Sequence, residues 1–158
     1  MSSLENIRPY IDYHIALTRQ VWECIAQITD EQFLQEDAYS RGSIRNLMVH
    51  LASVDRRWLA GLKNLPDVGH LQFEDYPDRA SAHAAFESVA QDLADYVAAL
   101  SVTELEQPPA GIPSPRMLVL MHMVNHGTDH RATVLQRLDE FGAPTFGQDF
   151  ILWLWSRK

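Results

Sequence analysis

The feature that most constrains the fold is the recurrence of apolar residues every three or four positions in four long segments of the chain. Because an α-helix has about 3.6 residues per turn, residues at this spacing gather on one face of a helix. Sustained alternation of apolar and polar residues, which favours strands, is absent from the sequence, and so is an internal repeat. The pattern predicts an all-α protein with four amphipathic helices.

Capping and helix-breaking residues bound the first two predicted helices. The apolar pattern of the first helix covers residues 4–28, and Thr29 suits the cap of a short turn that follows. Ser43 is expected to cap the second helix, which would begin at Ile44 and stop before Pro66.

A proline-rich segment separates the third predicted helix from the fourth. The third helix is expected from Ala82 to near Leu100. Residues 107–116 contain four prolines and can form neither a helix nor a central strand. Ser114 followed by proline fits an N-cap, so the fourth helix would begin there and run to Gly142. The short apolar tail beyond it is expected to pack against the other helices.

Length and charge set the class of protein. At 158 residues, 46% of them hydrophobic, the chain is expected to form one domain over residues 1–158, an antiparallel four-helix bundle with two long connections. The formal net charge of -8 disfavours nucleic acid as a partner, because nucleic acids bind basic surfaces. No run of about 20 apolar residues and no signal-peptide core is present, so a cytoplasmic protein without membrane contacts is expected.

The most informative polar residues are three histidines spaced four apart in the fourth predicted helix: His122, His126 and His130. Neighbours at this spacing lie on one helical face, so two imidazoles can converge on one metal ion. His122 and His130 are about 12 Å apart along the helix axis and cannot share an ion. The spacing therefore allows either adjacent pair as ligands.

A third ligand is expected from a facing helix, because metal sites in bundles are built between helices. His50 lies at the edge of the apolar stripe of the second predicted helix. Three neutral histidines would leave room for water or substrate, as catalytic sites do. The alternatives are a hydrogen-bonded core histidine at position 50 and a metal-free histidine pair on the surface.

The remaining candidate polar residues have weaker patterns. Asp129 fits either an acid that orients an imidazole or a solvated charge. His14, His70 and His83 lack a paired spacing and are interpreted as incidental. No catalytic residue is assigned, since no nucleophile and base pair is evident; a general base would be metal-bound solvent, Asp129 or His122.

Two segments resemble the DinB family of the DinB/YfiT-like metalloenzymes: GSIRNLMVHLASVDRRWL at residues 42–59 and MHMVNHGTDHRATVLQRL at residues 121–138. The first has the Gly-Ser start, the histidine and the spacing of Asp55 and Trp58, and the second has the NHxxxHR core. The resemblance extends over nearly the whole chain, including the stretch from Gly142 to Phe150.

The resemblance implies a ligand set of His50, His126 and His130, which selects one of the two histidine pairs. It also implies a four-helix bundle, frequently a homodimer, that holds zinc or nickel, with iron as a further option. Two departures concern the surroundings of the site: Asp55 stands where glutamate is common, and Ala132-Thr133 stands where Gly-Gln is usual.

These observations lead to two hypotheses about function. The first is a divalent-metal-dependent enzyme acting on a small molecule, in which the ion polarises a substrate oxygen or lowers the pKa of bound water or thiol. Relatives in the wider superfamily imply a thiol-dependent transferase or isomerase using a low-molecular-weight thiol, or hydrolase-like chemistry. The second is a non-catalytic metal- or ligand-binding stress-response bundle. A weaker third reading is a metal-free dimerisation module.

Overall fold

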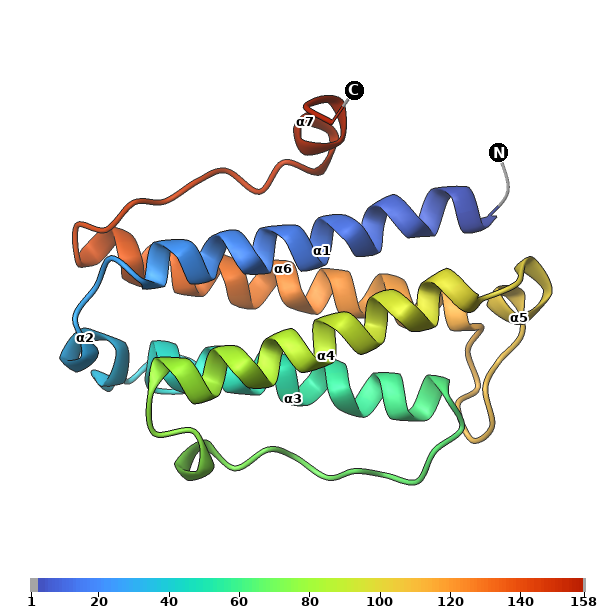
Figure 1. Ribbon diagram of the computed structural model, residues 1–158, viewed down its shortest axis with the longest axis horizontal. Helices are drawn as coiled ribbons and strands as arrows, with labels where there is room; N and C mark the ends of the chain where they lie inside the picture. Colours follow the sequence, from blue (N-terminus) through green and yellow to red (C-terminus); the bar gives the residue numbers. More distant parts are fainter. Residues whose placement is uncertain (1–2, 158) are drawn as a thin grey trace.

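The computed structural model describes residues 3–157, and this part of the chain is helical without strands. Four long helices form a bundle (Figure 1): α1 (Ser3–Ile25), α3 (Ile44–Leu62), α4 (Arg79–Ala99) and α6 (Arg116–Glu140). The connections and the C-terminal end carry the short helices α2 (Asp30–Leu34), η1 (Phe73–Asp75), α5 (Val102–Glu106) and α7 (Phe150–Trp155). The predicted all-α four-helix bundle is confirmed.

The expected antiparallel arrangement is only partly correct, because the four long helices do not simply alternate in direction. Helices α1 and α6 run one way and α3 and α4 run the other way, so the bundle contains two parallel pairs (Figure 1). Tyr96, near the end of α4, donates a hydrogen bond of 3.2 Å to the carbonyl of Leu62 at the end of α3. Because α3 and α4 are parallel neighbours, residues 63–78 must return along the length of the bundle, which explains the long connection.

Side-chain caps begin α2 and α3 as predicted. Thr29 forms a capping box with Gln32, and the Ser43 hydroxyl accepts a hydrogen bond of 3.2 Å from the Asn46 amide. These side chains satisfy N–H groups that have no partner within the helix. The start of α3 is important for the site, because this helix carries His50.

Other predicted boundaries were displaced. The first helix ends at Ile25 rather than at residue 28, where the Arg79 guanidinium donates to the carbonyls of Ile25 and Ile28. Asp78 caps α4, so this helix begins before Ala82.

The predicted Ser114 cap was wrong. Pro115 occupies the N-cap position of α6, without a side-chain cap. The Arg116 amide instead donates a hydrogen bond of 3.2 Å to the carbonyl of Gln107. The carbonyl of Gln107, in the proline-rich segment, thus accepts a hydrogen bond from an amide at the start of α6, which is the role expected of the Ser114 side chain.

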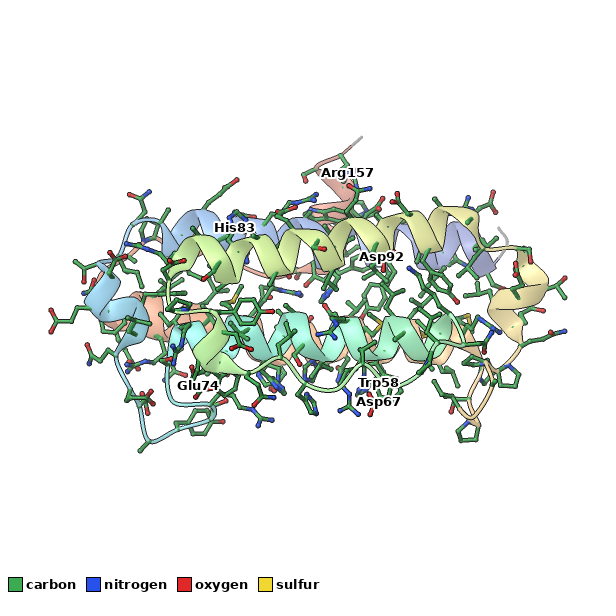
Figure 2. The ribbon with its side chains drawn as sticks, turned by 60° about the horizontal axis from the view of Figure 1, so that its bottom comes forward. Trp58, Asp67, Glu74, His83, Asp92 and Arg157 are labelled. Carbon is green, nitrogen blue, oxygen red and sulfur yellow. The ribbon has the colours of Figure 1, made fainter. Side chains whose placement is uncertain are left out.

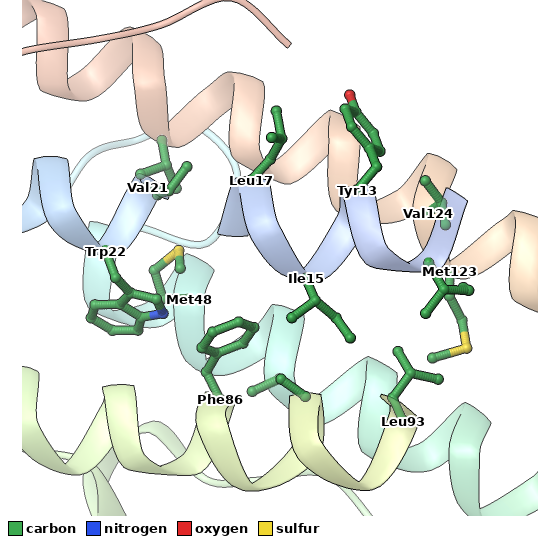
Figure 3. Packing of buried hydrophobic residues seen from close by; sticks show 14 of the residues in the cluster. Tyr13, Ile15, Leu17, Val21, Trp22, Met48, Phe86, Leu93, Met123 and Val124 are labelled. Carbon is green, nitrogen blue, oxygen red and sulfur yellow. The ribbon is translucent and has the colours of Figure 1, made fainter. Parts of the chain in front are cut away.

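The core lies between the four long helices, and Figure 3 shows buried side chains of all four packed together. Leu93 of α4 and Met123 of α6 are at most 1% exposed. Truncating such a side chain to alanine costs about 2–5 kcal/mol. Within residues 3–157, no helix combines the length and apolarity needed to cross a membrane.

The C-terminal tail packs along α1. Tyr13 donates a hydrogen bond of 2.6 Å to the carbonyl of Gln148, and the rings of Phe150 and Trp153 meet the Tyr13 ring edge to face. One side of α7 is therefore partly buried against α1, while Leu152 on its other side is exposed.

Candidate metal site

Three histidine side chains from two helices meet where α3 packs against α6. Each of His50 on α3 and His126 and His130 on α6 offers one ring nitrogen, and these atoms all lie within 4.8 Å of one another. The two Nε2 atoms of His126 and His130 are 2.9 Å apart. Ligand nitrogens about 2.0–2.1 Å from one ion lie roughly 3.0–3.4 Å apart, so only small shifts separate this cluster from a coordination shell.

The packing of α3 against α6 brings the three histidine rings together. The His50 ring centre lies 5.4 Å from that of His126 and 4.9 Å from that of His130. Helices α3 and α6 pack side by side, and the i,i+4 spacing places both α6 rings on the face toward α3. The cluster therefore follows from a local spacing on one helix and a contact between two.

Burial keeps the three imidazoles neutral. His50 is 9% exposed, and removal from water lowers its pKa to about 3, with smaller contributions from the charges of Arg41 and the neighbouring histidines. Burial likewise lowers the pKa of His126 to about 4 and lowers that of His130. Neutral rings at pH 7 have the free lone pairs that a metal ion requires.

The hydrogen bonding of the cluster is incomplete in a way that fits a cation. The Nδ1 atoms of His126 and His130 are buried and have no hydrogen-bond partner in the described part of the chain, and the Nε2 atoms face each other. When both rings carry their proton on Nδ1, two lone pairs point at each other. Since buried polar groups are normally paired, a divalent ion between the Nε2 atoms would stabilise this arrangement.

A buried polar network lies behind the cluster and joins α1, α3 and α6. His14 Nε2 is 2.8 Å from Asp55 Oδ2, and Arg131 Nη1 is 2.9 Å from His14 Nδ1. Arginine can only donate, so Nδ1 accepts and the Nε2–H of His14 donates to Asp55. A neutral imidazole thus connects a buried guanidinium to a buried carboxylate. The interpretation of His14 as incidental was wrong, because its partner is 41 residues away in sequence.

Arg131, the neighbour of a candidate ligand, fixes α6 against α1. Its side chain is fully buried, and its other N–H groups donate to Thr18, Thr128 and Gln148 at 2.7–3.2 Å. At Gly127 a Cβ atom would lie 2.3 Å from the His14 ring, so the close approach of the two helices requires glycine here. The sequence signal that could have pointed to this network was His14, a histidine within the apolar stripe of the first helix.

Asp55 is also connected electrostatically to the cluster. One carboxylate oxygen, Oδ1, is buried and accepts no hydrogen bond from any residue that the structure describes. The negative charge of Asp55 acts to raise the pKa of His126 and His130, against the larger effect of burial. A buried anion near three neutral rings favours the arrival of a cation.

The other candidate residues on α6 lie outside the cluster. His122 is exposed, packs edge to face on Trp58 and has its ring centre 6.1 Å from that of His126. Asp129 is exposed, and its carboxylate makes no hydrogen bond or ion pair within the described part of the chain. Its negative charge acts to raise the pKa of His130, more strongly than that of Asp55 does, so Asp129 is a solvated charge that influences the cluster without a hydrogen bond to it.

A cavity of about 340 Å³ lies beside His50, which is the one candidate ligand among its lining residues. We call it the site cavity. Its wall is formed by the start of α3, by Ser53 and by the loop before α4; the lining residues are Arg41, His50, Ser53, His70, Leu71, Gln72, Phe73 and Glu74. Figure 2 shows this loop running along α3, with Glu74 at one end of the loop and Asp67 farther along it; the labelled Trp58 belongs to α3.

The loop that forms this wall is attached to α3 at named points. The Ser53 hydroxyl accepts a hydrogen bond of 2.9 Å from the Leu71 amide and lies 3.3 Å from His70 Nδ1. Arg57 contacts His70 Nε2 and forms an ion pair with Asp67. His70 was wrongly interpreted as incidental, because its contacts cross from a loop to a helix. His83 lies apart, stacked on Trp22.

Comparison with known proteins adds one finding. The model of the DinB family matches the chain over residues 1–157. No curated protein matches the chain.

Proposed function

Since the chain belongs to the DinB family, we propose that it is a divalent-metal-dependent enzyme in which His50, His126 and His130 hold the ion. The observation that carries the proposal is the convergence of three ring nitrogens from two helices within 4.8 Å. A structural metal site is usually closed by four protein ligands, whereas three ligands leave a position for substrate. The site cavity adjoins His50, where such a position would be reached.

A bound divalent ion would polarise a substrate oxygen or lower the pKa of a coordinated water or thiol. The protein's own residues supply the surroundings for this chemistry. Burial holds the imidazoles neutral, and the Asp55 carboxylate compensates part of the ion's charge. The network of His14, Asp55 and Arg131 fixes the helices that present the ligands.

We propose a low-molecular-weight thiol as the substrate or co-substrate, with transferase or isomerase chemistry. Zinc and nickel are the first candidates for the ion, and iron is the next, because imidazole binds all three. A thiol would approach through the site cavity, which is small enough to exclude a macromolecule.

Elemental analysis of protein purified without an affinity tag tests the metal site. We expect close to one divalent ion per chain in the wild type, and loss of the ion in the variant His126→Ala. The variant His122→Ala, which removes an exposed imidazole one turn away, should retain the ion. Equal metal content in all three proteins would reject the ligand set.

Thiol-transfer assays then test the chemistry. Turnover with small thiols that disappears in His126→Ala and survives in His122→Ala would support the enzyme. A protein that binds the ion but turns over no thiol would instead favour the non-catalytic metal- or ligand-binding bundle.

A further inference from the structure

We propose that the site cavity recognises a small substrate carrying a single carboxylate, which pairs with Arg41 while the other end of the molecule reaches the histidine cluster. This inference rests on the proposed function and names a feature of its substrate. Three observations carry it: the guanidinium of Arg41, which has no partner among the described residues, its nearness to the cluster, and the charge pattern of the cavity wall.

Arg41 is the arginine of the cavity that remains available to a ligand. It is exposed, it lines the site cavity, and its guanidinium forms no hydrogen bond or ion pair within residues 3–157. The arginines nearby are occupied: Arg57 pairs with Asp67, and Arg56 donates to the carbonyl of Val68. A guanidinium binds a carboxylate through two parallel hydrogen bonds, which favours this anion over a neutral group.

The backbone beside this side chain is held in place. Asn46 donates a hydrogen bond of 2.8 Å to the carbonyl of Arg41, and Ser43 caps the helix that follows. Gly42 adopts a φ of 95°, a conformation that other residues rarely adopt, and so turns the chain into α3. Arg41 is thus anchored at the N-terminal end of the helix that carries His50.

The charge of Arg41 reaches the cluster. It is among the causes that lower the pKa of both His50 and His130, which places a positive potential on the side of the cavity. Arg41 and His50 both line this cavity of about 340 Å³. A molecule bound at the guanidinium therefore extends only a short way before it meets His50 of the cluster. The substrate is therefore small.

The opposite charge in the wall limits the number of anionic groups. Glu74 lines the same cavity and forms no ion pair with Arg41. Its carboxylate repels a second anionic group, so a ligand with one carboxylate at the Arg41 end fits better than a ligand with two separated ones.

Cobalt(II)-loaded full-length protein allows a direct test, because binding of a thiol to cobalt changes its absorption spectrum. The probes are 3-mercaptopropionate and 4-mercaptobutyrate, each compared with the mercapto-alcohol of equal chain length. We expect the wild type to bind the better carboxylate about tenfold more tightly than its alcohol, as one charge-assisted contact provides. The preference should fall to about twofold or less in Arg41→Gln and be partly kept in Arg41→Lys.

Two further variants sharpen the test. Glu74→Gln should strengthen carboxylate binding, since it removes a repulsive charge. Arg19→Gln removes one positive charge at a residue that pairs with Glu87 and does not line the cavity, so its preference should match the wild type.

The outcomes separate this inference from the function on which it rests. Failure of the wild type to take up cobalt overturns the proposed metal site and this inference with it. Three other results overturn the role of Arg41 and leave the proposed metal site intact. They are uptake of cobalt with no binding of any probe, binding with no preference for the carboxylate, and an equal preference in the wild type and Arg41→Gln.

Discussion

His14 of α1 donates a buried hydrogen bond of 2.8 Å to Asp55 of α3, across 41 residues of sequence. Arg131 of α6 completes the link from the other ring nitrogen. All three residues are at most 3% exposed, so a polar layer crosses the bundle between apolar neighbours. This layer fixes three helices together next to the histidine cluster.

Replacing Asp55 with asparagine should lower the free energy of unfolding of the metal-free protein by about 3 kcal/mol, because the buried guanidinium loses its compensating anion. Urea denaturation at pH 7 measures the change. Asp129→Asn makes the same chemical substitution at an exposed carboxylate and should change stability by less than about 0.5 kcal/mol. Similar losses in both variants would show that the buried charge has no special importance.

Replacing Gly127 with alanine should destabilise the protein by about 2 kcal/mol or more, although alanine is the better helix former. The new Cβ would lie 2.3 Å from His14 Cε1 and 2.9 Å from Arg131 Nη1. Thermal unfolding measures the loss. Gly61→Ala in α3 is the matched control, since its Cβ would meet only the end of the Ile112 side chain at 3.0 Å. A stabilised Gly127→Ala protein would contradict the tight packing of His14.

The stability of the metal-free protein should fall with pH below about 6.5. The folded state lowers the pKa of His50 to about 3 and that of His126 to about 4, mainly through burial. Between those values and about 6.5 the unfolded chain binds protons that the folded chain does not, so acid favours unfolding. Each ring contributes at most about 1.4 kcal/mol per pH unit, less in proportion to its remaining exposure.

Denaturation between pH 7 and pH 5 tests this dependence. In this range most carboxylates remain ionised, so the histidines dominate the change. His50→Asn removes one of the depressed groups and should give a shallower slope than the wild type. Identical slopes would mean that His50 is not held neutral by burial.

Addition of a divalent ion should raise the melting temperature. An ion that binds only the folded state stabilises it by about 2.7 kcal/mol at a free concentration 100 times its dissociation constant. Titration of zinc or nickel, followed by calorimetry, measures the shift. His130→Ala should abolish the shift and His122→Ala should preserve it, and a shift that survives in His130→Ala would place the ion elsewhere.

Part of the fold and of the candidate site followed from local patterns in the sequence. The Ser43 cap was predicted correctly, because capping depends on a side chain and amides within three residues. The Ser114 cap was wrong, because the amide at the start of α6 is satisfied by Gln107, a partner outside the local pattern. The shared face of His126 and His130 was likewise predictable from their spacing, whereas their nearness to His50 depended on how two helices pack.

By itself, the sequence determined the helical segments, the apolar faces and the histidine pair, since each is set by the period of the α-helix and by neighbours within a few residues. Only the tertiary structure decided that α3 and α4 run parallel and that His14 joins Asp55 to Arg131. It also left the Arg41 guanidinium without a partner among residues 3–157, at the cavity beside His50. Such contacts join residues far apart in the chain, and their geometry is set by the packing of whole helices.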